Sequence, residues 1–137
     1  MVSKIRIFLA EDNPADVDLV REALREYKIE HELWLAPDGQ EAKRFIESMG
    51  TGAESPCPDV IMLDLNLPMA TGHELIALFR RHPRCTHTPI IVVTSSDSRK
   101  DRERSAELGA RYFRKPSELG EFLELGAVVR EAAGAGR

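Results

Sequence analysis

The chain has 137 residues, a length that a single domain can fill. Its net charge of −4 at pH 7 gives no electrostatic reason to expect nucleic acid or an anionic membrane as a partner. No apolar run approaches the roughly 20 residues of a membrane span. The start Met1-Val2-Ser3-Lys4 lacks the apolar segment of a secretory signal, so we expect a cytoplasmic protein.

The two cysteines are isolated in the sequence. Cys57 and Cys85 show neither a CxxC pair nor the spacing of metal ligands, so we expect both to be reduced, structural residues. The histidines have polar neighbours and are expected on the surface rather than at a metal; they are His31, His73, His82 and His87.

Strand and helix patterns alternate five times along the chain. Apolar runs predict strands at residues 5–10, 31–36, 60–63, 89–94 and 111–114. Apolar residues at helical spacing predict helices that begin at Pro14, after Pro37-Asp38-Gly39, at Thr71-Gly72 and near Leu119, and a run of helix-forming residues predicts another from Arg99. Such alternation predicts one α/β domain, residues 1–137, with a parallel sheet covered by helices on both faces.

The last two predicted helices are weak. The segment Arg99–Leu108 contains helix formers but almost no apolar stripe, so it would be poorly anchored. Gly120 and Gly126 weaken the final helix, and residues 131–137 are expected to form a frayed tail.

Reactive side chains follow four of the predicted strands. They are Glu11 and Asp12, Asp64, Thr94 and Lys115. The carboxyl ends of parallel strands lie at one edge of a sheet, and ligands bind in the crevice outside that edge. We therefore expect these five side chains to converge on one site.

The chemistry of this set points to phosphoryl transfer. Three carboxylates cannot remain ionised close together without raising one another's pKa or recruiting a cation, and oxygen ligands suit Mg²⁺. A carboxylate can also act as a nucleophile that forms an aspartyl phosphate. Lys115 and Thr94 would supply a positive charge and a hydroxyl donor to the phosphoryl oxygens. The set predicts an aspartate that accepts a phosphoryl group beside a magnesium ion.

At these positions the sequence resembles the receiver domain of two-component response regulators. The resemblance extends over essentially the whole chain and rests on Glu11-Asp12, the stretch Leu63–Pro68 with Gly72 beyond it, Val93-Thr94-Ser95 and Lys115-Pro116. It implies a flavodoxin-like (βα)5 fold, doubly wound around a five-stranded parallel sheet of order 2-1-3-4-5. It also implies a protein that is no enzyme beyond its own aspartyl phosphorylation and dephosphorylation.

The resemblance assigns the site residues. Asp64 would be the phosphoacceptor for a sensor histidine kinase, and Mg²⁺ would be held by Glu11, Asp12, Asp64 and the backbone carbonyl of Asn66. Thr94 and Lys115 would contact the phosphoryl oxygens.

Three further positions have implied roles. Ser95 stands where the family has a small residue that keeps the phosphoryl group accessible. Tyr112 matches an aromatic residue that swings inward when the threonine moves. The Lys115-Pro116 peptide is expected to be cis, which proline tolerates.

The amino-acid sequence of these motifs is similar to that of small receivers paired with bacterial phytochrome kinases. That similarity implies a stand-alone receiver that acts through an unknown downstream protein. It also implies a homodimer through the face formed by the fourth helix, fifth strand and fifth helix.

Three alternatives remain open from the sequence. A flavin-binding flavodoxin-like protein would need a phosphate loop after the first strand, where Glu11-Asp12 would repel a phosphate. A haloacid-dehalogenase-type phosphatase would need an acid at position 66, which is Asn66. A degenerate receiver could serve as a scaffold without being phosphorylated.

Overall fold

The computed structural model describes residues 4–50 and 57–135. Five strands form the main sheet: β1 (Ile5–Ala10), β2 (His31–Ala36), β3 (Val60–Leu63), β6 (Ile90–Thr94) and β7 (Arg111–Arg114). The helices are α1 (Pro14–Glu26), α2 (Gly39–Ser48), α3 (Gly72–Arg81), α4 (Arg99–Glu107), α5 (Leu119–Leu123) and α6 (Leu125–Ala135). Two short strands, β4 (Asn66–Leu67) and β5 (Ala70–Thr71), form a separate antiparallel hairpin.

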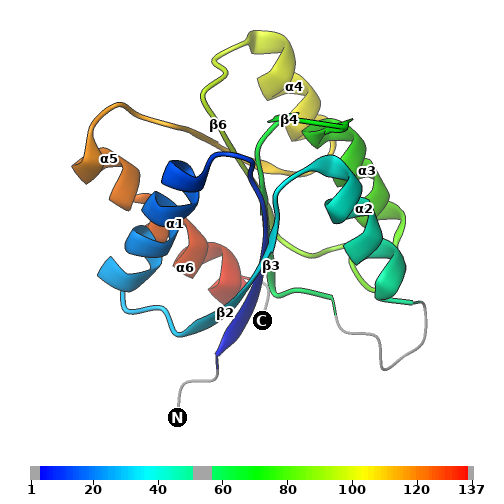
Figure 1. The fold of residues 1–137 in the computed structure, drawn as a ribbon, viewed down its shortest axis with the longest axis horizontal. Coiled ribbons are helices and arrows are strands. Elements are labelled where there is room, and N and C mark those ends of the chain that lie inside the picture. The colour runs from blue at the N-terminus through cyan, green and yellow to red at the C-terminus, as the bar shows by residue number, and fades with distance from the viewer. Residues whose placement is uncertain (1–3, 51–56, 136–137) are drawn as a thin grey trace.

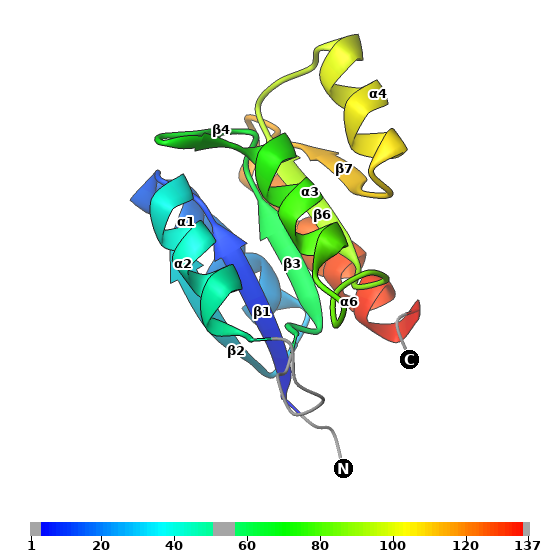
Figure 2. The same cartoon turned by 90° about the vertical axis from the view of Figure 1, so that its right-hand side faces the viewer.

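The main sheet is wholly parallel and runs β2-β1-β3-β6-β7. This confirms the predicted order 2-1-3-4-5, counting only the strands of this sheet. Figure 2 shows β1 and β3 running in the same direction, toward the end of the molecule that carries β4. The side chains that follow the strands therefore lie at one edge.

Helices cover both faces of the sheet. Helices α1, α5 and α6 lie on one side and α2, α3 and α4 on the other (Figure 1). Each face buries its own apolar cluster: Phe8 and Phe79 lie in the cluster under α2 and α3, and Leu9 and Phe122 lie in the cluster under α1 and α6. All four residues of β3 are buried because both of its faces are covered.

Side chains at the helix starts fix where the helices begin. Asn13 Oδ1 accepts from the backbone nitrogen of Ala15 at 2.9 Å, and Pro14 occupies the first helical position of α1. Ser98 caps α4, of which Ser105 is the one buried residue. The predicted scarcity of apolar anchors in α4 is therefore confirmed.

The C-terminal segment differs from the prediction. The single final helix is divided into α5 and α6 at Glu124. Helix α6 continues to Ala135, so residues 131–135 are helical rather than a frayed tail, because Val129 and Ala132 are buried against the core. Residues 136 and 137 lie outside the described part.

The cysteines are not isolated thiols. Cys57 and Cys85 form a disulfide with 5.7 Å between their Cα atoms. The prediction of reduced cysteines was wrong because 28 residues separate them in sequence, and only the packing of α3 beside β3 brings them together. Likewise, His82 is buried rather than at the surface, and its ring hydrogen-bonds the carbonyl of Gly50.

One half-buried arginine, Arg80, ties the end of α3 to its surroundings. The Arg80 guanidinium donates to the carbonyls of Leu108, Gly109 and Thr88, so it links α3 to the turn before β7 and to the loop before β6.

Across the described ranges, none of the helices is both long enough and apolar enough to cross a membrane.

Candidate active site

Acidic side chains from two strand ends meet as predicted. One carboxylate oxygen each from Glu11, Asp12 and Asp64 lies within 4.8 Å of the others. Glu11 and Asp64 are buried, at 3% and 7% exposure, whereas Asp12 is exposed. The backbone nitrogen of Asp64 donates to the Ala10 carbonyl at 3.0 Å, and this bond holds the ends of β1 and β3 together.

Lys115 lies at the centre of this cluster. Its Nζ donates to Glu11 Oε1 at 2.7 Å, Asp16 Oδ2 at 2.8 Å and Asp64 Oδ2 at 2.9 Å. Burial alone would disfavour the ammonium, but the hydrogen bonds to these three carboxylates raise the pKa of Lys115 above its usual value. Lys115 is therefore a fixed positive charge inside an acidic site.

Glu11 responds in the opposite sense to burial. Burial raises the pKa of the Glu11 carboxyl above its usual value, although the hydrogen bond and charge of Lys115 oppose the shift. The other carboxylate oxygen of Glu11 accepts from the backbone nitrogen of Asn13 at 3.2 Å. Glu11 is thus held from two sides.

Gly72 makes room for the backbone beside Asp64. A Cβ atom at Gly72 would lie 2.6 Å from the Asp64 carbonyl oxygen and 2.7 Å from the Leu65 Cα. No side chain fits there, so α3 can begin directly against the turn that follows β3 only with glycine. Asp64 Oδ1 in turn accepts from the backbone nitrogen of Asn66 at 3.1 Å.

Thr94 ends β6 with its side chain fully buried. Its Oγ1 accepts from the Ser96 backbone nitrogen at 3.3 Å, and its carbonyl accepts from the Lys115 backbone nitrogen at 2.7 Å. This last bond ties the threonine to the strand that carries the lysine. Ser95 is exposed.

Tyr112 lies on β7 and is half-buried. Its hydroxyl donates to the Ser96 carbonyl at 2.7 Å, and the Arg102 guanidinium carbon lies 4.5 Å from the centre of its ring. Ser96 Oγ donates to Asp101 on α4 at 2.6 Å. Ser96 therefore contacts Thr94, Tyr112 and α4 together.

A sequence comparison identifies the family. The response regulator receiver domain matches residues 7–125. The chain belongs to this family.

The most similar relatives are response regulators or receiver domains. The chain is 37% identical over 120 residues to the response regulator Rcp1 of Synechocystis sp., and the aligned region covers 87% of this chain and 82% of Rcp1. The phosphorylated cyanobacterial phytochrome response regulator RcpA superposes with a TM-score of 0.81 at 33% identity, covering 94% of this chain and 93% of RcpA. These matches favour neither the flavodoxin-like nor the phosphatase alternative, and the receiver domain is not a known family of catalytic enzymes.

Two similar structures carry a metal ion. The Mn²⁺-bound form of Rcp1 has a TM-score of 0.79 at 34% identity and covers 93% of this chain and 92% of that one. The receiver domain of the Pseudomonas aeruginosa PAO1 sensor kinase PA1611, with a magnesium ion in its active-site cleft, has a TM-score of 0.75 at 26% identity and covers 96% and 99%. In the present chain, the carboxylate oxygens of Glu11, Asp12 and Asp64 fit the same kind of hard divalent cation.

The structure corrects one expectation about the receiver site and adds one residue. All peptide bonds among the described residues are trans, including Lys115-Pro116. The prediction of a cis peptide was wrong. An X–Pro bond prefers trans by roughly 0.5–1 kcal/mol, and nothing in the local sequence specified cis. Asp16 was missed altogether. Its signal was its place in the first turn of α1, three residues after the Asn13 cap and at the same sheet edge.

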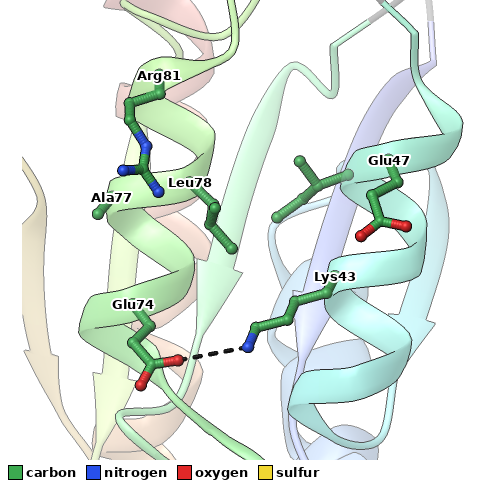
Figure 3. A pocket seen from close by; sticks show the side chains of 7 residues that line it. Lys43, Glu47, Glu74, Ala77, Leu78 and Arg81 are labelled. Carbon is green, nitrogen blue, oxygen red and sulfur yellow. Dashed lines mark ion pairs between the residues drawn. The ribbon is translucent and has the colours of Figure 1, made fainter.

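A second concavity lies away from this site, between α2 and α3. It has a volume of about 440 Å³ and an apolar floor that includes Ile46 and Leu78. Figure 3 shows its charged rim, where Lys43 reaches across to Glu74, and the two charged atoms lie 3.5 Å apart. Its rim carries both signs of charge and contributes nothing to the acidic site.

Proposed function

We propose that this receiver accepts a phosphoryl group on Asp64 from a sensor histidine kinase. The observation that carries the proposal is the surrounding of the Asp64 carboxylate. One oxygen accepts from Lys115 Nζ at 2.9 Å, the other accepts from a backbone nitrogen, and two further acids lie close enough to share a divalent cation with it. A buried aspartate that binds a divalent cation and accepts a hydrogen bond from a lysine can act as a nucleophile toward a phosphorus atom.

The proposed reaction exchanges one bond to phosphorus for another. An Asp64 carboxylate oxygen attacks, the phosphorus–nitrogen bond of the phosphohistidine breaks, and the leaving imidazole keeps the electron pair and takes up a proton. Glu11, Asp12, Asp64 and the Asn66 carbonyl would hold Mg²⁺, which would neutralise charge on the phosphoryl oxygens. Lys115 donates hydrogen bonds to those same oxygens.

A phosphoryl group on Asp64 also gives Thr94 a new acceptor. If Thr94 moves toward it, the bond between Thr94 and the Ser96 backbone lengthens. Ser96 is held in turn by Tyr112 and by Asp101 of α4. Because α4 buries a single residue, it needs little energy to shift, so the signal would reach the surface of α4 and β7.

The partner is proposed from the relatives. RcpA is described as a phytochrome response regulator, and RtBRR, 32% identical, as a bacteriophytochrome response regulator. We therefore propose a phytochrome-type kinase as phosphodonor, a protein as downstream target and a homodimer through α4, β7 and the α5–α6 segment. We also propose a cytoplasmic location, which cell fractionation tests: the protein should be found in the cytosolic fraction, and its recovery from another fraction would refute the proposal.

Phosphorylation by acetyl phosphate tests the proposal without the kinase. The wild-type protein should become phosphorylated when Mg²⁺ is present and stay unmodified in EDTA. Asp64→Asn should stay unmodified in both. Equal labelling of wild type and Asp64→Asn would refute the phosphoacceptor assignment. Absence of labelling together with absence of beryllofluoride binding would favour the scaffold alternative.

A further inference from the structure

Lys115 has as many acidic partners as it has protons to donate. An ammonium carries three N–H groups, and Glu11, Asp16 and Asp64 each accept from it at 2.7–2.9 Å. Two of these acids belong to the group whose oxygens lie close enough to share a cation. Asp16 does not belong to that group.

This arrangement sets the lysine against a divalent cation. Both need the oxygens of Glu11 and Asp64, and the two positive charges repel each other. A lysine with no other partner would have to be pulled off those oxygens into a half-buried position without an anion, and burying an unpaired charge is unfavourable. Asp16 offers the same ammonium an acceptor that the cation does not use.

We infer that Asp16 is a positioning residue that keeps the Lys115 ammonium in the site while Glu11 and Asp64 serve as metal ligands. In the protein without metal, Asp16 takes one of the three hydrogen bonds of Lys115. On metal binding it retains that bond, and the lysine stays beside Asp64, where the phosphoryl group would arrive. This inference deepens the proposed function and rests on it for the phosphoryl step alone.

Helix α1 holds Asp16 in place for this task. The Asn13 cap and Pro14 fix the first turn, and Val17 and Val20 bury the helix against the core. The Asp16 side chain keeps 22% of its surface exposed, against 11% for Lys115, so the bond lies at the mouth of the site. An acid in the first turn of a helix is also favoured by the helix dipole, which provides the competing, purely structural explanation for Asp16.

A double-mutant cycle on metal affinity separates the two explanations. Mg²⁺ binding is measured by calorimetry, and Mn²⁺ binding by electron paramagnetic resonance, for the full chain. Asp16→Asn should weaken Mg²⁺ binding about tenfold, because Lys115 then has no carboxylate partner other than Glu11 and Asp64 and competes more strongly with the metal for their oxygens. In a Lys115→Met background the same change should weaken binding by no more than about twofold, since no ammonium remains to be diverted.

Two matched variants complete the test. Asp18→Asn removes the same charge from an exposed position on the same helix and should leave the metal affinity within about twofold of wild type. Asp16→Glu keeps the charge and should recover most of the affinity that Asp16→Asn loses. Circular dichroism of each variant confirms that it is folded under the titration conditions.

Several results would overturn the inference. An equal loss of affinity from Asp16→Asn in both backgrounds would show a general charge effect, and no loss in either would leave Asp16 with its helix-dipole role alone. These outcomes are distinct from a failure of the proposed function. That failure would appear as unphosphorylated wild-type protein in acetyl phosphate with Mg²⁺, whatever the metal affinities are.

Discussion

Replacing Lys115 with methionine should destabilise the metal-free protein and strengthen its binding of Mg²⁺. Methionine keeps an unbranched apolar stem of similar length but removes the charge. Three carboxylates within 2.9 Å of one nitrogen would then face one another without a cation between them. The same charge that stabilises the fold competes with the metal, so the two effects must have opposite signs.

The magnitude follows from the burial of the partners. Removing one member of a buried ion pair costs about 3–5 kcal/mol. Lys115 and Asp16 keep 11% and 22% of their side-chain surface exposed, so we expect a somewhat smaller loss than that, about 2–4 kcal/mol in the free energy of unfolding. Because Lys115 donates to two of the three acids of the metal group, its loss should lower the Kd for Mg²⁺ about tenfold or more.

The assay is urea unfolding in EDTA and in excess Mg²⁺, with calorimetry for the affinity. Mg²⁺ should restore more stability to Lys115→Met than it adds to the wild type. Lys43→Met is the matched control, because Lys43 pairs with Glu74 at 3.5 Å on the surface and should alter neither quantity appreciably (Figure 3). If Lys115→Met were as stable as wild type in EDTA and bound Mg²⁺ no more tightly, the account of the site would be wrong.

Three further predictions concern Gly72, the Cys57–Cys85 disulfide and Glu11. Gly72→Ala should lower the free energy of unfolding by about 1–3 kcal/mol and weaken Mg²⁺ binding, because the alanine Cβ would lie 2.6 Å from the Asp64 carbonyl oxygen. Urea unfolding measures the first effect and calorimetry the second, and unchanged values would contradict the close packing at Gly72. Reducing the Cys57–Cys85 disulfide should lower the free energy of unfolding by roughly 3–4 kcal/mol for its 28-residue separation, and identical unfolding curves with and without reductant would argue against the bond. The raised pKa of Glu11 means that the folded protein keeps this proton to higher pH than the unfolded chain. In EDTA its stabilising contribution is therefore complete below pH 4.5 and is lost as the pH rises through the folded pKa. Glu11→Gln should flatten that decline in a series of unfolding curves, and an unchanged slope would refute it.

The strands and the main site were predictable because each rests on a local pattern. The buried run Val60–Leu63 and the acid after it place Asp64 at a strand end without any knowledge of the other strands. Parallel alternation then brings Glu11 and Lys115 to the same edge. The local patterns therefore sufficed for residues that the backbone itself positions.

What was missed depends on contacts between distant segments. The Cys57–Cys85 bond needs two loops to meet at the end of α3, and their sequence shows only two separate cysteines. Asp16 is one acid among several in α1, and only the rotation of that helix aims it at a lysine 99 residues away. The split of the last helix at Glu124 likewise depends on packing rather than on a local signal.

The most direct test of the central claim locates the phosphoryl group itself. The protein is phosphorylated by a cognate histidine kinase, reduced with borohydride, which converts an aspartyl phosphate to homoserine, and digested for mass spectrometry. We expect homoserine at position 64 and at no other position. A phosphoryl group that survives reduction on a serine, threonine or histidine, with Asp64 unaltered, would contradict the account.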